Sequence, residues 1–372
     1  MSHLLFISHA RGVHGAEAVM VQAIRACVAG GARVTVTVPS IVADSGLDAV
    51  LEGIPKVRVV AFPYRAAGVH LWRTALVRLY NLPALWRLHK LLRKDKADCI
   101  CSSSSITLIG ADLARLTRTR HVWHWHELAD SSFGWHPSMK GLYRRLAQRT
   151  DTIIFIAKQQ QKIWEDTLGR PFPNAQVVYN PIKRMDATQT NGLAPHKGVR
   201  IGFIGHFEAR KNIGLLVSAF EKIHPQHPDA SLWLCGAITE EDKNRINEMT
   251  GLREPTVVVF PQTPKVSQFY GEIDLLVLPS WRETMPLVVI EAMQLGVCVL
   301  QTNQSCMKEI LKDGIETLFF SPYQPDALLS LLEKCMHADF RGGIASAGQK
   351  KALQLVNKQS FENQMQTILC ES

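Results

Sequence analysis

The sequence predicts an α/β protein of two domains, each a doubly wound parallel sheet. The chain has 372 residues, more than a single hydrophobic core usually serves, so two domains are expected. Short apolar runs alternate with helical patterns along the chain, which is typical of parallel sheets with crossover helices. The alternation stops at the polar residues 184–198 and then starts again. We therefore expect a domain over 1–183, a linker over 184–198 and a second domain over 199–350.

The first domain begins as a βαβ unit. Its first strand is followed by a glycine-containing loop and a helix through Ala29, which Gly30 and Gly31 can end. Such a loop lies at the carboxyl end of a strand, where open α/β sheets bind ligands. The expected strands of this domain are residues 3–8, 33–38, 57–61, 98–102, 121–124, 152–156 and 177–179.

The second domain repeats the pattern, with a helix expected over residues 212–223. Its strands are expected at 200–204, 231–235, 256–260, 274–278, 297–301 and 317–320. Residues 351–369 predict one last helix with no strand after it.

Composition excludes several classes of protein. The chain is 46% hydrophobic and 20% charged, an ordinary globular balance. We find no run of about 18 apolar residues and no signal peptide, and we expect a cytoplasmic chain. The eight cysteines contain no C-x-x-C pair, so we expect reduced thiols and no metal cluster.

Positive charge is concentrated in the first half of the chain. Residues 1–183 carry 24 Lys and Arg against 12 Asp and Glu, whereas the remainder carries 18 against 21. Residues 70–96 predict two helices separated near Pro83, with leucines on one face and basic residues on another. Such helices bind anionic membranes, although a helix packed on the sheet with a solvated basic face is the alternative. No nucleic-acid-binding module is visible. The candidate acceptor or membrane residues are Trp72, Arg73, Arg78, Trp86, Arg87, Lys90, Arg93 and Lys94.

Two glutamates flank a strand-to-helix turn in the second domain. Glu283 follows an apolar run, and Pro286 can take the first position of a helix that contains Glu291 and ends at Gly296. Eight residues of helix would separate the carboxylates by about 12 Å, whereas a glycosidase acid/base pair needs roughly 5–9.5 Å. Two contacts on an extended ligand fit better, with an anion bound at the helix start between them. A nucleotide sugar has that form. Two unrelated surface glutamates are the alternative.

These residues resemble the retaining glycosyltransferases of the GT-B fold, the family 4 group that carries an E-x7-E motif. The resemblance implies two Rossmann-like domains facing across a cleft and a C-terminal helix, here 351–372, that crosses back to the first domain. It implies that Glu283 contacts the donor sugar and Glu291 the nucleotide ribose. The backbone beside Glu283 would contact the phosphate, at Thr284, Met285, Pro286 and Leu287.

A second match begins at Gly205. The family writes G-R-L-x-x-x-K-G there, with the Arg and Lys on the donor diphosphate. This chain has His206 in place of the Arg, keeps Lys211, and places Arg210 beside it. Because negative charge develops on a leaving diphosphate, a cation is needed there. A solvated lysine at a helix start is the alternative for Lys211.

Two weaker matches lie in the first domain. The Gly12, Gly15 and Glu17 pattern resembles the family's G-G-A-E, and places Gly15 near the donor. His126, followed by an acid, resembles a family histidine close to the reacting centre. His124 lies on the same side of the expected strand, so either histidine can take that role, and a packed histidine is the alternative.

The resemblance implies a retaining, metal-independent hexosyltransferase without a cofactor. His126, Glu283 and Lys211 would be catalytic, with front-face attack and the leaving phosphate as base. The acceptor would be a membrane-linked glycan or lipid of lipopolysaccharide, O-antigen or exopolysaccharide type, reached from the inner face of the plasma membrane. Two other functions remain open, a noncatalytic nucleotide-sugar-binding subunit on the membrane and a nucleotide-sugar epimerase. Thr284-Met285-Pro286 replaces the family's G-F-G, which leaves the sugar open.

Overall fold

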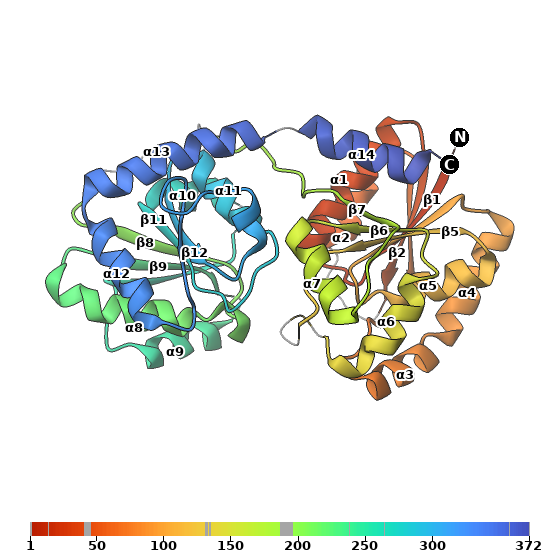
Figure 1. Ribbon diagram of the computed structural model, residues 1–372, viewed down its shortest axis with the longest axis horizontal. Coiled ribbons are helices and arrows are strands. Elements are labelled where there is room, and N and C mark those ends of the chain that lie inside the picture. The colour runs from red at the N-terminus through yellow and green to blue at the C-terminus, as the bar shows by residue number, and fades with distance from the viewer. Residues whose placement is uncertain are drawn as a thin grey trace. The chain divides into compact units, whose positions relative to one another are not determined.

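The computed structural model describes residues 2–13, 15–40, 46–130, 133, 135–186, 196–237, 239–263, 265–356 and 358–371. The chain forms two compact units: unit 1 is Met1–Pro181 with Asn357–Ser372, and unit 2 is Ile182–Val356. Each unit is a parallel sheet with crossover helices, as the alternating pattern predicts (Figure 1). Most of the expected 184–198 linker, residues 187–195, lies outside the described residues.

Unit 1 has a seven-stranded sheet in the order β3-β2-β1-β4-β5-β6-β7. Its strands are β1 (His3–Ile7), β2 (Arg33–Pro39), β3 (Val57–Phe62), β4 (Cys99–Ser103), β5 (Arg120–Trp125), β6 (Thr152–Phe155) and β7 (Ala175–Val177). Its helices are α1 (Gly15–Ala29), α2 (Gly46–Glu52), α3 (Leu71–Tyr80), α4 (Leu82–Lys94), α5 (Leu108–Thr117), η2 (Pro137–Met139), α6 (Lys140–Ala147), α7 (Lys158–Leu168) and α14 (Lys358–Cys370).

Strand β1 shows why this sheet is covered on both faces. Successive side chains of a strand point to opposite faces. Leu4 and Phe6 pack in a core with α1, α2 and α14. Leu5 and Ile7 pack in another core with α4 and α5. The strand is therefore apolar throughout, as buried parallel strands are.

Unit 2 has a six-stranded sheet in the order β10-β9-β8-β11-β12-β13. Its strands are β8 (Arg200–Ile204), β9 (Ser231–Ala237), β10 (Val257–Pro261), β11 (Leu275–Leu278), β12 (Cys298–Thr302) and β13 (Leu318–Phe320). Its helices are η4 (Ala209–Lys211), α8 (Ile213–Ile223), η5 (His224–Gln226), α9 (Glu240–Met249), α10 (Val266–Glu272), α11 (Leu287–Gln294), η6 (Cys306–Glu309), α12 (Pro325–Met336) and α13 (Ala338–Leu355).

Every strand expected from the sequence is present, although β7 starts two residues earlier than predicted. The predicted break near Pro83 is confirmed, but the helices separate at Asn81 and the proline lies in the first turn of α4. Proline is tolerated there because a first-turn N–H has no helical partner.

The prediction of one helix over 351–369 is wrong. Val356 leaves helical geometry (φ −71°, ψ 68°), so the segment divides into the end of α13 and the separate helix α14. The two helices serve different cores: Ala352 is buried in unit 2, whereas Phe361 and Met365 pack in the α1 core of unit 1. The return of the C-terminal helix to unit 1 is confirmed.

Membrane-spanning helices and metal-binding clusters are both absent from the residues that the structure describes. Within the described ranges, no helix combines the length and apolar character needed to cross a bilayer. The same residues hold no group of three or more His, Cys, Asp or Glu arranged to bind a metal ion.

Candidate active site

The two motifs of unit 2 meet at the carboxyl edge of its sheet. Strand β8 pairs with β11, so the loops that follow them lie side by side. The N–H of Trp281 donates to the carbonyl of Arg210 (3.0 Å), and the Asn212 side chain donates to the carbonyl of Pro279 (3.2 Å). These bonds fix one loop against the other. The edge is where open α/β sheets bind ligands.

Glu283 and Lys211 form a buried ion pair between these loops. Lys211 Nζ donates to Glu283 Oε1 (2.6 Å), and Ser280 Oγ donates to the same oxygen (2.7 Å). Arg210 Nη1 lies 3.8 Å from Glu283 Oε2. Burial would raise the pKa of Glu283, but the charges of Lys211 and Arg210 and the hydrogen bonds hold it below its ordinary value. The carboxyl is therefore ionised at neutral pH.

Two glycines allow the backbone to approach closely beside this pair. Gly205 has φ +145° and Gly236 has φ +130°, a region that other residues rarely adopt. A Cβ added to Gly236 would lie 2.0 Å from the carbonyl oxygen of Gly205. The ends of β8 and β9 thus leave no room for a side chain at residue 236.

His206 and Arg210 lie beside the pair rather than on it. His206 Nδ1 is 3.7 Å from Glu208 Oε1, and Arg210 Nε donates to Glu208 Oε2 (3.0 Å). Of the two cations that face Glu283, Lys211 is the closer, at 2.6 Å against 3.8 Å for Arg210.

Helix α11 starts directly after the Glu283 loop. Pro286 was predicted at the first helical position but is the N-cap, so the helix begins one residue later, and Pro286 provides no side-chain cap. First-turn N–H groups without a cap can bind an anion. Thr284 and Met285 are buried, and Leu287 is half-buried. The helix ends as predicted, with Gly296 at φ +77°.

Glu291 lies one turn inside α11 and is held by Tyr270 of α10. Tyr270 Oη donates to Glu291 Oε2 (3.0 Å). Burial raises the pKa of Glu291, while Tyr270 and the charge of Lys183 lower it in part. Sequence reasoning missed Tyr270, since a lone buried tyrosine carries no motif. Glu291 therefore has a fixed orientation separate from the Glu283 pair.

Unit 1 has its own polar cluster at the carboxyl edge of its sheet. His124 and His126 lie on one side of the end of β5, with ring centroids 4.1 Å apart. Burial lowers the pKa of both, so they are neutral. Neither Nε2 has a hydrogen-bond partner within the described part of the chain. The two histidines lie on the same side of the strand, as predicted from the alternation of side chains along it. Both Nε2 atoms are suited to a polar ligand.

The cluster also contains a pair that sequence reasoning did not assign. His9 Nδ1 lies 2.9 Å from Oε1 of Glu17, which is buried in the first turn of α1. Burial would lower the pKa of His9, but Glu17 raises it above its ordinary value. Gly15, the predicted donor contact, is the exposed first residue of α1, and a Cβ there would meet no atom within 4 Å.

Comparison with known proteins finds one family model for the first part of the chain and another for the second part. Residues 14–181 match the family model described as glycosyl transferase 4-like domain. Residues 186–351 match the model described as glycosyl transferases group 1. The chain belongs to the GT-B glycosyltransferases.

Relatives of this glycosyltransferase are distant. An uncharacterized glycosyltransferase of Haemophilus influenzae is 26% identical over 59% of this chain and 61% of its own length. The lipopolysaccharide core biosynthesis mannosyltransferase LpsB of Rhizobium meliloti is 28% identical over 37% of this chain and 40% of its own. The chain thus spans less than two thirds of these curated relatives. Among solved structures, Anabaena Alr3699/HepE in complex with UDP and glucose has a TM-score of 0.81 and 18% identity, covering 100% of both chains. This likeness shows the fold.

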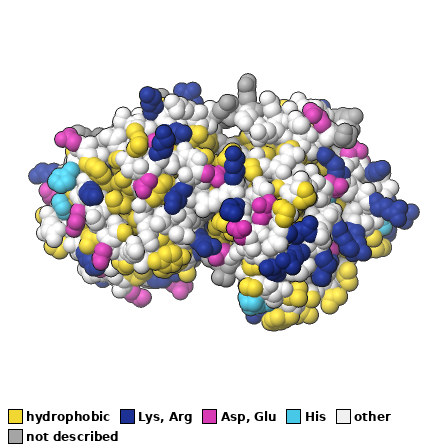
Figure 2. Space-filling model, in the orientation of Figure 1, with side chains coloured by type: hydrophobic (Ala, Val, Ile, Leu, Met, Phe, Trp, Pro, Cys, Tyr) yellow, Lys and Arg dark blue, Asp and Glu magenta, His cyan; other side chains and the backbone are white. Residues whose placement is uncertain are grey.

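The predicted basic helices of the glycosyltransferase form an exposed apolar and basic surface. Thr74 is the buried residue of α3, whereas Trp72 is 60% exposed and Trp86 of α4 is 58% exposed. We call this the α3–α4 surface: Leu71, Trp72, Arg73, Leu76, Leu79, Leu82, Trp86, Arg87, Lys90, Arg93 and Lys94, all exposed. Arg78 is different, because it pairs with Asp112 of α5 (2.5 Å). Figure 2 shows Lys and Arg side chains gathered on this unit over α6 and α4, with hydrophobic side chains over α3.

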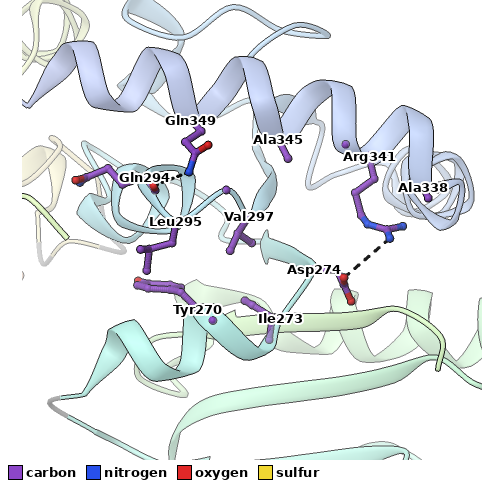
Figure 3. A pocket seen from close by; sticks show the side chains of 13 residues that line it. Tyr270, Ile273, Asp274, Gln294, Leu295, Val297, Ala338, Arg341, Ala345 and Gln349 are labelled. Atoms are coloured by element: carbon purple, nitrogen blue, oxygen red, sulfur yellow. Dashed lines mark hydrogen bonds and ion pairs between the residues drawn. The ribbon is translucent and has the colours of Figure 1, made fainter. Parts of the chain in front are cut away.

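A cavity of about 290 Å³ lies elsewhere in unit 2, between α13 and the opposite, amino edge of the sheet. Arg341 of α13 points toward Asp274 (3.9 Å), and Tyr270 and Leu295 form another part of the wall (Figure 3). Glu283 and Lys211 do not line it. The cavity is therefore separate from the Lys211–Glu283 pair, although Tyr270, which holds Glu291, forms part of its wall.

Proposed function

We propose that this glycosyltransferase moves a hexose from a nucleotide diphosphate sugar to a membrane-linked glycan or lipid, with retention and without a metal ion. The observation that carries the proposal is the buried Lys211–Glu283 pair beside the uncapped start of α11. A cation and a helix N-terminus at one point suit a diphosphate that gains negative charge as the glycosidic bond breaks.

Each donor contact has a residue in unit 2. Lys211 takes the leaving diphosphate, with Arg210 beside it, and first-turn N–H groups of α11 share that charge. Glu283, ionised, accepts hydrogen bonds from sugar hydroxyls. Glu291 accepts from the ribose while Tyr270 holds its other oxygen. Anabaena Alr3699/HepE binds UDP and glucose, which supports a nucleotide-sugar donor of this kind.

The way Glu283 is held supports the front-face form of the proposed retaining reaction. A carboxylate nucleophile must reach the anomeric carbon, yet Glu283 Oε1 is bonded to Lys211 and Ser280. We therefore expect front-face attack, in which the leaving phosphate takes the acceptor proton. His126, neutral and with an unbonded Nε2, would donate or accept a hydrogen bond at the sugar.

The acceptor is proposed from the α3–α4 surface. Its exposed tryptophans and leucines are bordered by basic residues, a combination that binds anionic lipid. Each basic residue near such a surface contributes about 1 kcal/mol. A lipid-linked glycan of lipopolysaccharide, O-antigen or exopolysaccharide type would be reached in this way, on the inner face of the plasma membrane. The relation to LpsB agrees with that class.

The test begins with thermal shift against UDP, GDP, ADP and their sugars, which names the base. Transfer is then measured by mass spectrometry with membrane extracts as acceptor, for the native chain, Glu283→Ala, Lys211→Ala and the exposed control Lys222→Ala. We expect the first two variants to lose transfer and the control to keep it. Unchanged transfer in Lys211→Ala overturns the proposal. Binding without transfer would indicate a noncatalytic subunit, and sugar conversion without acceptor an epimerase.

A further inference from the structure

Two aromatic side chains stack on each other at the carboxyl edge of unit 2. Trp281 follows β11 and Tyr323 follows β13, with ring centroids 5.5 Å apart and planes 28° apart. Both remain open to solvent, Trp281 by 39% and Tyr323 by 60%. A stacked pair that served only to bury its rings would leave less of them in water. Two adjacent exposed rings offer an apolar surface on which a ligand can pack.

The stacked rings of Trp281 and Tyr323 lie beside the candidate active site. Trp281 lies two residues before Glu283, and its N–H is bonded to the carbonyl of Arg210 (3.0 Å). The turn that carries Tyr323 is anchored because the N–H of Asn303, after β12, donates to the carbonyl of Phe320 (2.7 Å). The rings therefore have a fixed position relative to Glu283.

The order of the strands places the stacked rings of Trp281 and Tyr323 away from Glu291, the proposed ribose contact. Lys211 follows β8, Glu283 follows β11, and Tyr323 follows β13, the edge strand. The rings thus lie on the β12–β13 side of Glu283. Glu291 is held from α10, the helix that precedes β11. A nucleobase belongs at the ribose end of the donor, whereas the rings lie beside the sugar contact.

We propose that Trp281 and Tyr323 form a platform for a sugar ring of the acceptor glycan. A pyranose has a face of C–H groups that packs against an aromatic ring, while its hydroxyls stay in water or bind polar groups. Such a platform places the acceptor next to the sugar held by Glu283. This inference rests on the proposed glycosyltransferase function and adds the chemistry by which unit 2 binds the acceptor.

The test is direct binding of free sugars to the full chain with UDP present. The probes are maltotriose, cellotriose, mannotriose and chitotriose, measured by saturation-transfer NMR and Trp fluorescence. The variants are Trp281→Ala, Tyr323→Ala and Tyr323→Phe, with Phe340→Ala as control, because Phe340 is an exposed aromatic of α13. UDP affinity is measured on each.

We expect at least one trisaccharide to bind the native chain, and Trp281→Ala and Tyr323→Ala to weaken it about tenfold. Tyr323→Phe and Phe340→Ala should bind as the native chain does, and UDP affinity should stay unchanged in Tyr323→Ala. If no trisaccharide binds, or if both alanine variants bind normally, the platform is wrong while UDP binding still supports the donor site. If the native chain bound none of UDP, GDP and ADP, that result would instead contradict the proposed function.

Discussion

Lys211 has two roles that can be tested separately. It forms the ion pair with Glu283, and in the proposed reaction it stabilises the charge on the leaving diphosphate. Replacing Lys211 by Met removes the cation and keeps most of the side-chain volume. We expect kcat to fall about 100-fold, equivalent to about 2.7 kcal/mol, by analogy with the loss of one donor that stabilises a developing anion. The measurement is transfer, or donor hydrolysis, at saturating donor. The matched control is Lys222→Met, an exposed lysine of α8.

The same substitution leaves Glu283 buried without its main partner. An uncompensated buried charge costs about 3–5 kcal/mol. Ser280 still donates to it, and Arg210 lies 3.8 Å away, so we expect about 2 kcal/mol. For a unit of this size that lowers the melting temperature by about 4–8 °C. The pKa of Glu283 also rises, so acid unfolding starts at higher pH. A carboxyl with a lowered folded pKa stabilises above its ordinary pKa and loses that contribution as pH falls through the folded value.

The double variant Lys211→Met, Glu283→Gln decides between the roles. With both charges gone, most of the melting temperature should return, because neither partner is left as a bare buried ion. Activity should stay low. A Lys211→Met enzyme with kcat within threefold of the native value would refute the role in catalysis. Recovery of activity in the double variant would show that neither charge is needed for transfer, and that Lys211→Met loses activity only because it leaves Glu283 as a bare buried ion.

Three further predictions concern other parts of the molecule. Glu291→Gln should weaken nucleotide binding roughly 10–100-fold by calorimetry. It should also raise the melting temperature at pH 7, because burial raises the pKa of Glu291 and the ionised form destabilises the folded state as pH rises through that value. A lower melting temperature would contradict this. Trp72→Ser with Trp86→Ser should lower co-sedimentation with anionic vesicles at least fivefold, because it removes apolar surface that inserts into the bilayer; equal binding would exclude the α3–α4 surface. Gly236→Ala should destabilise unit 2 by more than about 1 kcal/mol in thermal unfolding, because its Cβ would lie 2.0 Å from a backbone oxygen; a native melting temperature would show that the loop yields.

The local sequence pattern predicts the positions of the elements because most strands are apolar runs bounded by turn residues. Strand β8 was predicted at its observed residues for this reason. The break at Val356 could not be predicted in the same way, since both sides of it have helical sequence. What ends α13 there is the passage of the chain from unit 2 to unit 1, which is a tertiary event. Arg78 was grouped with the basic face because Asp112, its partner, lies 34 residues away.

The site shows the same division between local and tertiary information. Glu283 and Lys211 are recognisable in two separate motifs, but no local pattern joins residues 72 positions apart. Their contact depends on β8 lying next to β11 in the sheet. Tyr270 and the Trp281–Tyr323 stack carry no motif, and their roles follow only from coordinates.

The Lys211–Glu283 pair also bears on how a donor would enter. A diphosphate must compete with Glu283 for the lysine, because Nζ already donates to Oε1 at 2.6 Å. Exchanging one anionic partner for another costs less than stripping water from a free lysine, so the pair leaves Lys211 partly desolvated in advance. Glu283, released toward the sugar, still has Ser280 as a donor and Arg210 nearby. In the proposed donor complex, Arg210 would then neutralise the carboxylate that Lys211 leaves, a role that suits its position 3.8 Å from Glu283.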